Sequence, residues 1–133
     1  MDINKILLIG AGKMGGALVS GWLSNGLSPA QIMVLDPFPS SEVEALDLVL
    51  NPSIDAIVAA QPEIIVLAVK PQIAADILSD IAPTLPASSL VLSIMAGLSL
   101  DRLETLTGVK SIVRTMPNTP ASLGVGASVL IAS

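Results

Sequence analysis

The chain has 133 residues, of which 52% are apolar and 2% aromatic, and it has no cysteine and a formal net charge of −5. This balance argues against nucleic acid as a partner, because phosphates are neutralised by clustered lysine and arginine, and the six basic residues here are dispersed. The lack of cysteine excludes disulfides and thiolate metal sites, and no apolar stretch approaches the roughly 20 residues of a membrane span. Because no signal-peptide pattern occurs at the N-terminus, we expect one cytoplasmic domain over residues 1–133, without a metal.

The first part of the chain predicts a strand, a glycine loop and a helix. Residues 5–9 have strand length and are apolar from Ile6 to Ile9, and the helical pattern follows over residues 14–23. Between and within them, Gly10, Gly12 and Gly15 occupy the three glycine positions of a dinucleotide fingerprint. The first permits a tight turn, the second lets the backbone approach a pyrophosphate, and the third lets the helix pack on the sheet. We therefore expect the phosphates of NAD(P)H at the start of this helix.

Residues 31–35, which are apolar after Gln31, predict the next strand, and this strand ends at Asp36. This acid follows the last fingerprint glycine at about the spacing, roughly 20 residues, at which a carboxylate binds the adenosine ribose hydroxyls. No arginine follows closely that could pair with a 2′-phosphate, and a carboxylate repels such a phosphate. The sequence therefore predicts a preference for NADH over NADPH.

The rest of the chain alternates between helical and strand patterns. Further helices are predicted to begin near Ser40, Ser53, Pro71 and Ser99, and further strands to occupy residues 46–50, 63–69, 89–94, 110–115 and 127–132. Continuous aliphatic runs are typical of strands that are buried on both faces of a parallel sheet. We expect an α/β fold with a Rossmann-type open, mostly parallel sheet and helices on both faces. Its ligands would bind beyond the carboxyl ends of the strands.

Four blocks of sequence lie at the predicted strand ends: IGAGKMG (residues 9–15), AVKPQ (68–72), SIMAG (93–97) and RTMPNTPA (114–121). In this order and approximate spacing, they resemble the signature blocks of pyrroline-5-carboxylate reductase. The resemblance implies reduction of a cyclic imino acid, 1-pyrroline-5-carboxylate, to L-proline with NAD(P)H in proline biosynthesis. It also implies a helical C-terminal domain, absent here, that forms a homo-oligomer and supplies most of the substrate-carboxylate site. We expect the 133-residue chain alone to turn over little or nothing.

The resemblance also implies roles for individual residues. The residues that would hold the pyrophosphate are Ile9, Gly10, Ala11, Gly12, Lys13 and Met14, and those that would pass beside the adenosine and the bridging ribose are Ala68, Val69, Lys70 and Pro71. The residues that would approach the nicotinamide are Ser93, Met95, Ala96 and Gly97. The residues that would face the nicotinamide ring and the bound imine are Met116, Pro117 and Asn118. Asn118 is a candidate for positioning the substrate. The catalytic acid is not identified, because the chain has no histidine, cysteine or tyrosine, which leaves lysine or carboxylates with shifted pKa as the acid–base groups of this chain. Hydride transfer to a protonated imine needs mainly positioning and exclusion of water.

Plainer interpretations stand beside these roles. Lys13 could be only a solvated loop residue, Met95 and Met116 could fill the core, and Arg114 is expected to pair with a carboxylate rather than to touch a ligand. Two other functions also fit the glycine loop. One is a β-hydroxyacid dehydrogenase, which shares the G-x-G-x-M-G beginning and against which the MPNTPA block argues. The other is a non-catalytic dinucleotide-sensing module, which would bind the cofactor without turnover.

Overall fold

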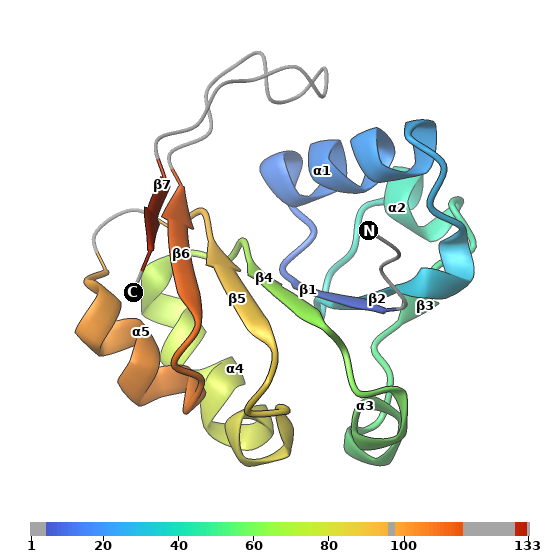
Figure 1. The fold of residues 1–133 in the computed structure, drawn as a ribbon. Helices are drawn as coiled ribbons and strands as arrows, with labels where there is room; N and C mark the ends of the chain where they lie inside the picture. Colours follow the sequence, from blue (N-terminus) through green and yellow to red (C-terminus); the bar gives the residue numbers. More distant parts are fainter. Residues whose placement is uncertain (1–4, 96–97, 116–129, 133) are drawn as a thin grey trace.

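The computed structural model describes residues 5–95, 98–115 and 130–132, which form one sheet with helices on both of its faces (Figure 1). Seven described strands pair in the order β3-β2-β1-β4-β5-β6-β7. Their bounds are β1 (Ile6–Ile9), β2 (Ile32–Leu35), β3 (Val49–Leu50), β4 (Ile64–Leu67), β5 (Leu90–Ser93), β6 (Ile112–Thr115) and β7 (Leu130–Ala132). The pairs from β3 through β6 are parallel, and β7 is antiparallel to β6. This confirms the predicted Rossmann-type, mostly parallel α/β sheet.

The strand order reverses next to β1, which pairs with β2 on one side and with β4 on the other. Ile9 is in register with Leu35 of β2 and with Leu67 of β4, so these three strands end at the same level. Open α/β sheets bind their ligands at such a switch point, beyond the carboxyl ends of the strands. The chain that follows Ile9, Leu35 and Leu67 is therefore where a ligand site is expected.

The described residues contain five α-helices and two short 3-10 helices: α1 (Lys13–Ser24), η1 (Pro29–Gln31), α2 (Ser41–Glu44), α3 (Ile54–Ala60), α4 (Pro71–Ile81), η2 (Ala82–Thr84) and α5 (Leu100–Thr107). Ser40, Ser53 and Ser99 cap α2, α3 and α5, because each hydroxyl accepts a hydrogen bond from the backbone N–H three residues later, at 3.2, 3.1 and 3.1 Å. These are the predicted helix starts, and α4 also begins at Pro71 as predicted. In α1, which begins one residue earlier than predicted, the N-cap is Gly12 and no side chain caps the helix.

The strands from β1 to β6 are all shorter than the sequence predicts, and the difference is largest for β3 and β4. The predicted strand over residues 46–50 is reduced to β3, because Asp47 adopts a φ of 60°, which an extended strand does not contain. The predicted strand over residues 63–69 is reduced to β4. The N–H of Ala68 still donates to the carbonyl of Ile9 at 2.8 Å, and α4 begins three residues later.

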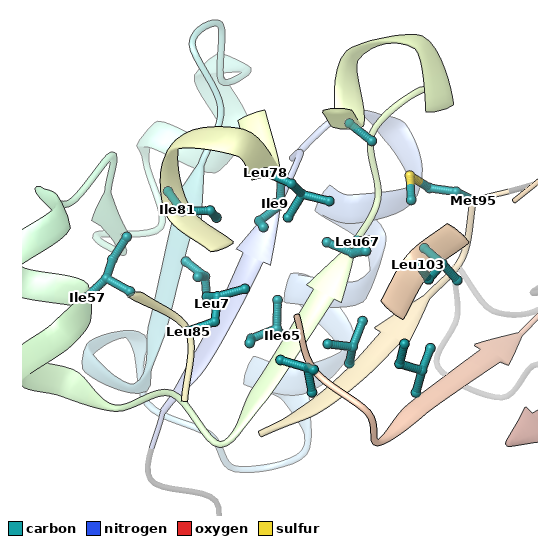
Figure 2. Close-up of a cluster of buried hydrophobic side chains, with 14 of the residues drawn as sticks. Leu7, Ile9, Ile57, Ile65, Leu67, Leu78, Ile81, Leu85, Met95 and Leu103 are labelled. Carbon is teal, nitrogen blue, oxygen red and sulfur yellow. The ribbon is translucent and has the colours of Figure 1, made fainter. Parts of the chain in front are cut away.

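Both faces of the sheet are buried. Leu7 and Ile9 of β1 belong to a cluster that also contains Leu78 of α4 and Leu103 of α5, and Figure 2 shows these side chains over the strands. Ile6 and Leu8 alternate with them and pack on the other face with Val19 of α1 and Val43 of α2. Burying each such side chain contributes about 1.5–3 kcal/mol, so the core fixes the strands firmly and with them the positions of their carboxyl ends.

The helices in the described part of the chain are all too short or too polar to cross a lipid bilayer.

Candidate functional site

The glycine loop between β1 and α1 makes three different steric demands. Gly10 has a φ of 95°, and a Cβ there would lie 2.6 Å from Cγ1 of Val69 and 2.8 Å from the carbonyl oxygen of Ala68. A Cβ on Gly15 would collide with the carbonyl oxygen of Gly10. At Gly12, by contrast, a Cβ would meet no atom within 4 Å. The fold therefore requires glycine at the first and third positions, and at the second position the backbone borders open space.

The first turn of α1 also faces this space without a side-chain cap. The N-cap is Gly12, which has no side chain that could cap the helix, and the first turn contains no acidic residue. The first N–H groups of an α-helix have no partner within the helix, and the helix dipole adds partial positive charge at this end. An anionic group can therefore take the place that Ser40, Ser53 and Ser99 fill in α2, α3 and α5.

Asp36 lies one residue beyond β2 and links this strand to the glycine loop. Its Oδ2 accepts a hydrogen bond from the N–H of Ala11 at 2.8 Å, and its Oδ1 accepts one from the N–H of Phe38 at 2.8 Å. A carboxylate has about four acceptor positions, so each oxygen can accept a further hydrogen bond from a ligand hydroxyl. The predicted ribose-binding acid is thus at the switch point, and its bonds to the backbone hold it beside the loop.

The sequence reasoning missed Asn51, which lies directly beyond β3. Its Oδ1 accepts a hydrogen bond from the N–H of Asp36 at 2.8 Å, and its Nδ2 donates one to the carbonyl of Asp36 at 2.9 Å. The signal available in the sequence was an asparagine that follows a strand and precedes a proline, a pattern that by itself indicates only a turn.

A pocket of about 460 Å³ lies between the glycine loop, α1 and α2. Its polar lining comes from Ser20, Ser40, Ser41 and Glu42, and Phe38, whose side chain is 88% exposed, lies at its border. Among the described residues that line the pocket, Glu42 is charged and none is basic. A 2′-phosphate on the adenosine ribose would therefore meet negative rather than positive charge in this pocket.

The other predicted contacts divide between the site and the core. Ala68, Val69 and the exposed Lys70 follow β4 at the switch point, and Lys70 is the N-cap of α4. Ser93 is 0% exposed and its hydroxyl accepts from the N–H of Met95 at 3.2 Å. Met95 is 5% exposed and belongs to the apolar cluster on the α4 and α5 side, which agrees with its plainer interpretation as a core residue (Figure 2).

Several predicted contacts cannot be placed. Ala96, Gly97, Met116, Pro117 and Asn118 lie outside the described residues, and for Lys13 and Pro71 only the backbone positions at the starts of α1 and α4 are described.

Two further observations concern charge. Nε of Arg114 is buried, and within the described ranges this atom has no hydrogen-bond partner. In the same ranges, no group of histidine, cysteine, aspartate and glutamate side chains could hold a metal ion.

Comparison with known proteins identifies one family model and several similar proteins. The model described as NADP oxidoreductase, coenzyme F420-dependent, matches residues 5–97. The pyrroline-5-carboxylate reductase of Haemophilus influenzae is 40% identical over 134 residues, which cover 99% of this chain and 49% of the relative. Among solved structures, the pyrroline-5-carboxylate reductase of Coxiella burnetii has a TM-score of 0.83 at 27% identity, and it is matched over 99% of this chain and 50% of its own.

The Plasmodium falciparum pyrroline carboxylate reductase, solved with NADP bound, has a TM-score of 0.81 at 32% identity, matched over 99% of this chain and 48% of its own. The chain thus spans about half the length of the relatives that it matches.

Proposed function

Because the chain belongs to the family described as NADP oxidoreductase, coenzyme F420-dependent, we propose that it is the cofactor-binding domain of a pyrroline-5-carboxylate reductase. The observation that carries this proposal is the open space beside Gly12, at an uncapped helix start and next to Asp36. This arrangement fits a dinucleotide, because a pyrophosphate needs close approach to backbone N–H groups and a ribose needs an acceptor. The reductase names of the relatives supply the reaction.

The described residues have separate parts in holding the cofactor. The backbone from Ile9 to Met14 would hold the pyrophosphate at the start of α1, and Asp36 would accept from the adenosine ribose. Ala68, Val69 and Lys70 would border the cofactor beyond β4. When bound, NAD(P)H supplies the hydride that reduces the carbon–nitrogen double bond of the imine. The chain's own contribution is to fix the position of the cofactor and to limit access of water.

We propose that the preferred cofactor is NADH. Asp36 and the pocket that contains Glu42 present negative charge where a 2′-phosphate would approach, and two like charges about 4 Å apart repel by about 1–4 kcal/mol near a protein surface. The affinities of the chain for NADH and NADPH, measured by titration of nicotinamide fluorescence, test this. We expect NADH to bind at least about tenfold more tightly, which corresponds to about 1.4 kcal/mol. Tighter binding of NADPH would refute the preference.

The reaction is tested with a chimera in which this chain replaces the matching half of the Haemophilus influenzae relative. We expect the chimera to form proline from 1-pyrroline-5-carboxylate and NADH, and not to oxidise β-hydroxy acids with NAD. A chimera that is folded and binds NADH, but converts neither substrate, would instead support a dinucleotide-sensing module. The 133-residue chain alone is expected to bind the cofactor and to form little or no proline.

A cytoplasmic location and homo-oligomerisation of the full-length protein belong to the same proposal. The resemblance to the reductases supports both parts. The location is also supported by the cofactor, since NAD(P)H is intracellular. Size-exclusion chromatography with light scattering on the chimera would measure the oligomeric state, and a monomer would contradict the second part.

A further inference from the structure

Asn51 pairs with Asp36 through its side chain rather than through its backbone. The ladder between β2 and β3 contains only two residue pairs, Met33 with Val49 and Val34 with Leu50. It continues with the backbone N–H of Asn51, which donates to the carbonyl of Val34 at 2.6 Å. Beyond this point the carboxamide of Asn51 takes over, and it bonds both the N–H and the carbonyl of Asp36, at 2.8 and 2.9 Å. A side chain that carries one acceptor and two donors here imitates a peptide group of a neighbouring strand.

The backbone conformation of Asn51 restricts which residues can do this. Its φ is 46°, in the left-handed region that glycine, asparagine and aspartate adopt most readily. Glycine has no side chain to pair with Asp36, and aspartate offers acceptors without a donor at neutral pH. Among the residues suited to this conformation, only asparagine can satisfy both backbone groups of Asp36.

Fixing the backbone of Asp36 also fixes its carboxylate. The carboxylate oxygens accept from the N–H of Ala11 and from the N–H of Phe38, both at 2.8 Å. A chain of hydrogen bonds therefore runs from Asn51 through Asp36 to the glycine loop, although Asn51 is 40 positions away from Ala11 in the sequence. If Asp36 lost its backbone partners, the carboxylate would sample more orientations and hold the loop less firmly.

We propose that Asn51 is a positioning residue that sets the discrimination between the free 2′-hydroxyl and the 2′-phosphate of the adenosine ribose. This inference rests on the proposed binding of a dinucleotide at Asp36. Asn51 does not itself reach the ribose in this scheme. It determines how rigidly Asp36 presents its remaining lone pairs to a hydroxyl and its negative charge to a phosphate.

The test is Asn51→Gly, which removes the carboxamide and keeps the left-handed backbone and its bond to Val34. The ratio of the dissociation constants for NADPH and NADH is measured by fluorescence titration of the whole chain. We expect NADH to bind about tenfold more weakly, as follows from the loss of hydrogen bonds that orient a charged group, and NADPH to change less. The ratio then falls. An unchanged ratio, including an equal loss of affinity for both cofactors, would overturn the discrimination role.

The chain offers a matched control in Gln61. It also has a left-handed φ, 49°, and its Nε2 donates to the carbonyl of Val58 at 2.8 Å, at the end of α3 that precedes β4. Gln61→Gly thus removes a side-chain amide bond in the same backbone conformation, away from the strand ends that carry the site. We expect it to leave the ratio of the two dissociation constants unchanged, and a fall in the ratio equal to that of Asn51→Gly would also overturn the proposal.

A second measurement does not depend on the cofactor. Hydrogen exchange of the Ala11 amide, followed by NMR without NADH, reports on the bond from Ala11 to Asp36. We expect exchange to become at least several-fold faster in Asn51→Gly and less so in Asn51→Asp, which keeps an acceptor for the N–H of Asp36. Unchanged exchange in both variants would overturn the positioning role itself. If exchange changes but the wild-type chain binds neither cofactor, the positioning within the protein stands and the proposed binding of a dinucleotide fails.

Discussion

Gly10, Gly12 and Gly15 are the same residue type in one loop, and the structure separates what each is needed for. Gly10 is fixed by its φ of 95° and by its approach to Val69, and Gly15 by the carbonyl of Gly10. Gly12 has a φ of −71° and open space where its side chain would be. The protein without ligand therefore has no steric reason to exclude alanine at this position, and the proposed pyrophosphate would supply one.

The first prediction follows from this difference. Gly12→Ala is expected to change the melting temperature by no more than a few degrees, because glycine at an N-cap stabilises a helix more than alanine does by about 1 kcal/mol or less. It is expected to weaken NADH binding by about tenfold or more, since the new methyl group occupies the approach of the pyrophosphate. Thermal unfolding and fluorescence titration on the same sample measure both effects.

Gly15→Ala serves as the contrasting variant. The added Cβ would collide with the carbonyl of Gly10, so we expect a loss of about 1–3 kcal/mol in the free energy of unfolding. If Gly12→Ala destabilised the chain as much as Gly15→Ala, the space beside Gly12 would have to be attributed to the fold and not to a ligand.

At the level of the elements, the starts of the helices divide into two kinds. Ser40, Ser53 and Ser99 cap α2, α3 and α5 with a hydroxyl, whereas α1 and α4 begin without a side-chain cap, and in α4 the first residue is Pro71, which has no N–H to satisfy. A capped start is complete within the protein. The start of α1 is not, and it lies at the carboxyl end of β1, where the switch point of the sheet is.

The second prediction concerns a capped start. Ser99→Ala removes the bond from the N–H of Arg102 to the Ser99 hydroxyl, 3.1 Å long, and should lower the free energy of unfolding by about 1 kcal/mol. Ser79→Ala is the control, because the exposed Ser79 hydroxyl in α4 bonds the carbonyl of Asp76 and caps nothing. We expect the control to be neutral or slightly stabilising, given the helix propensity of alanine. Urea unfolding compares the two, and equal losses would contradict the capping role.

For the whole molecule, much of the fold could be predicted from the sequence. The runs of β1, β2 and β4 are aliphatic without interruption, and this pattern occurs where both faces of a strand are buried, as Leu7 and Leu8 now are. The serine caps and Pro71 marked four helix starts because their chemistry is local. Asp36 could also be predicted, because it follows a strand and has the expected spacing from the glycines in the sequence.

Other features could not be predicted, because they depend on contacts between distant segments. The pairing of Asn51 with Asp36, for example, joins the loop after β3 to the loop after β2. Met95 has the same local pattern whether it borders a ligand or fills the core. Its burial is decided by packing within the cluster that includes Leu103, which no local pattern contains.

The third prediction links ligand binding to the stability of the whole chain. A ligand that binds only the folded state adds about 2.7 kcal/mol at a concentration of 100 times its dissociation constant. NADH at that level should raise the melting temperature by several degrees, and the N–H groups at the start of α1 should be among the most protected from hydrogen exchange. Gly12→Ala at the same NADH concentration is the control and should show a smaller rise. An equal rise in both proteins would locate the binding elsewhere.

The short strand β3 has a consequence for association between molecules. It lies at one edge of the sheet and consists of Val49 and Leu50, and the left-handed residues Asp47 and Asn51 bracket it. An exposed edge invites a strand from another molecule to pair with it, and two residues between two backbone kinks offer too short a template. The left-handed backbone at Asn51 thus limits the length of this edge strand, while its side chain holds Asp36, and we expect so short an edge to pair poorly with other molecules.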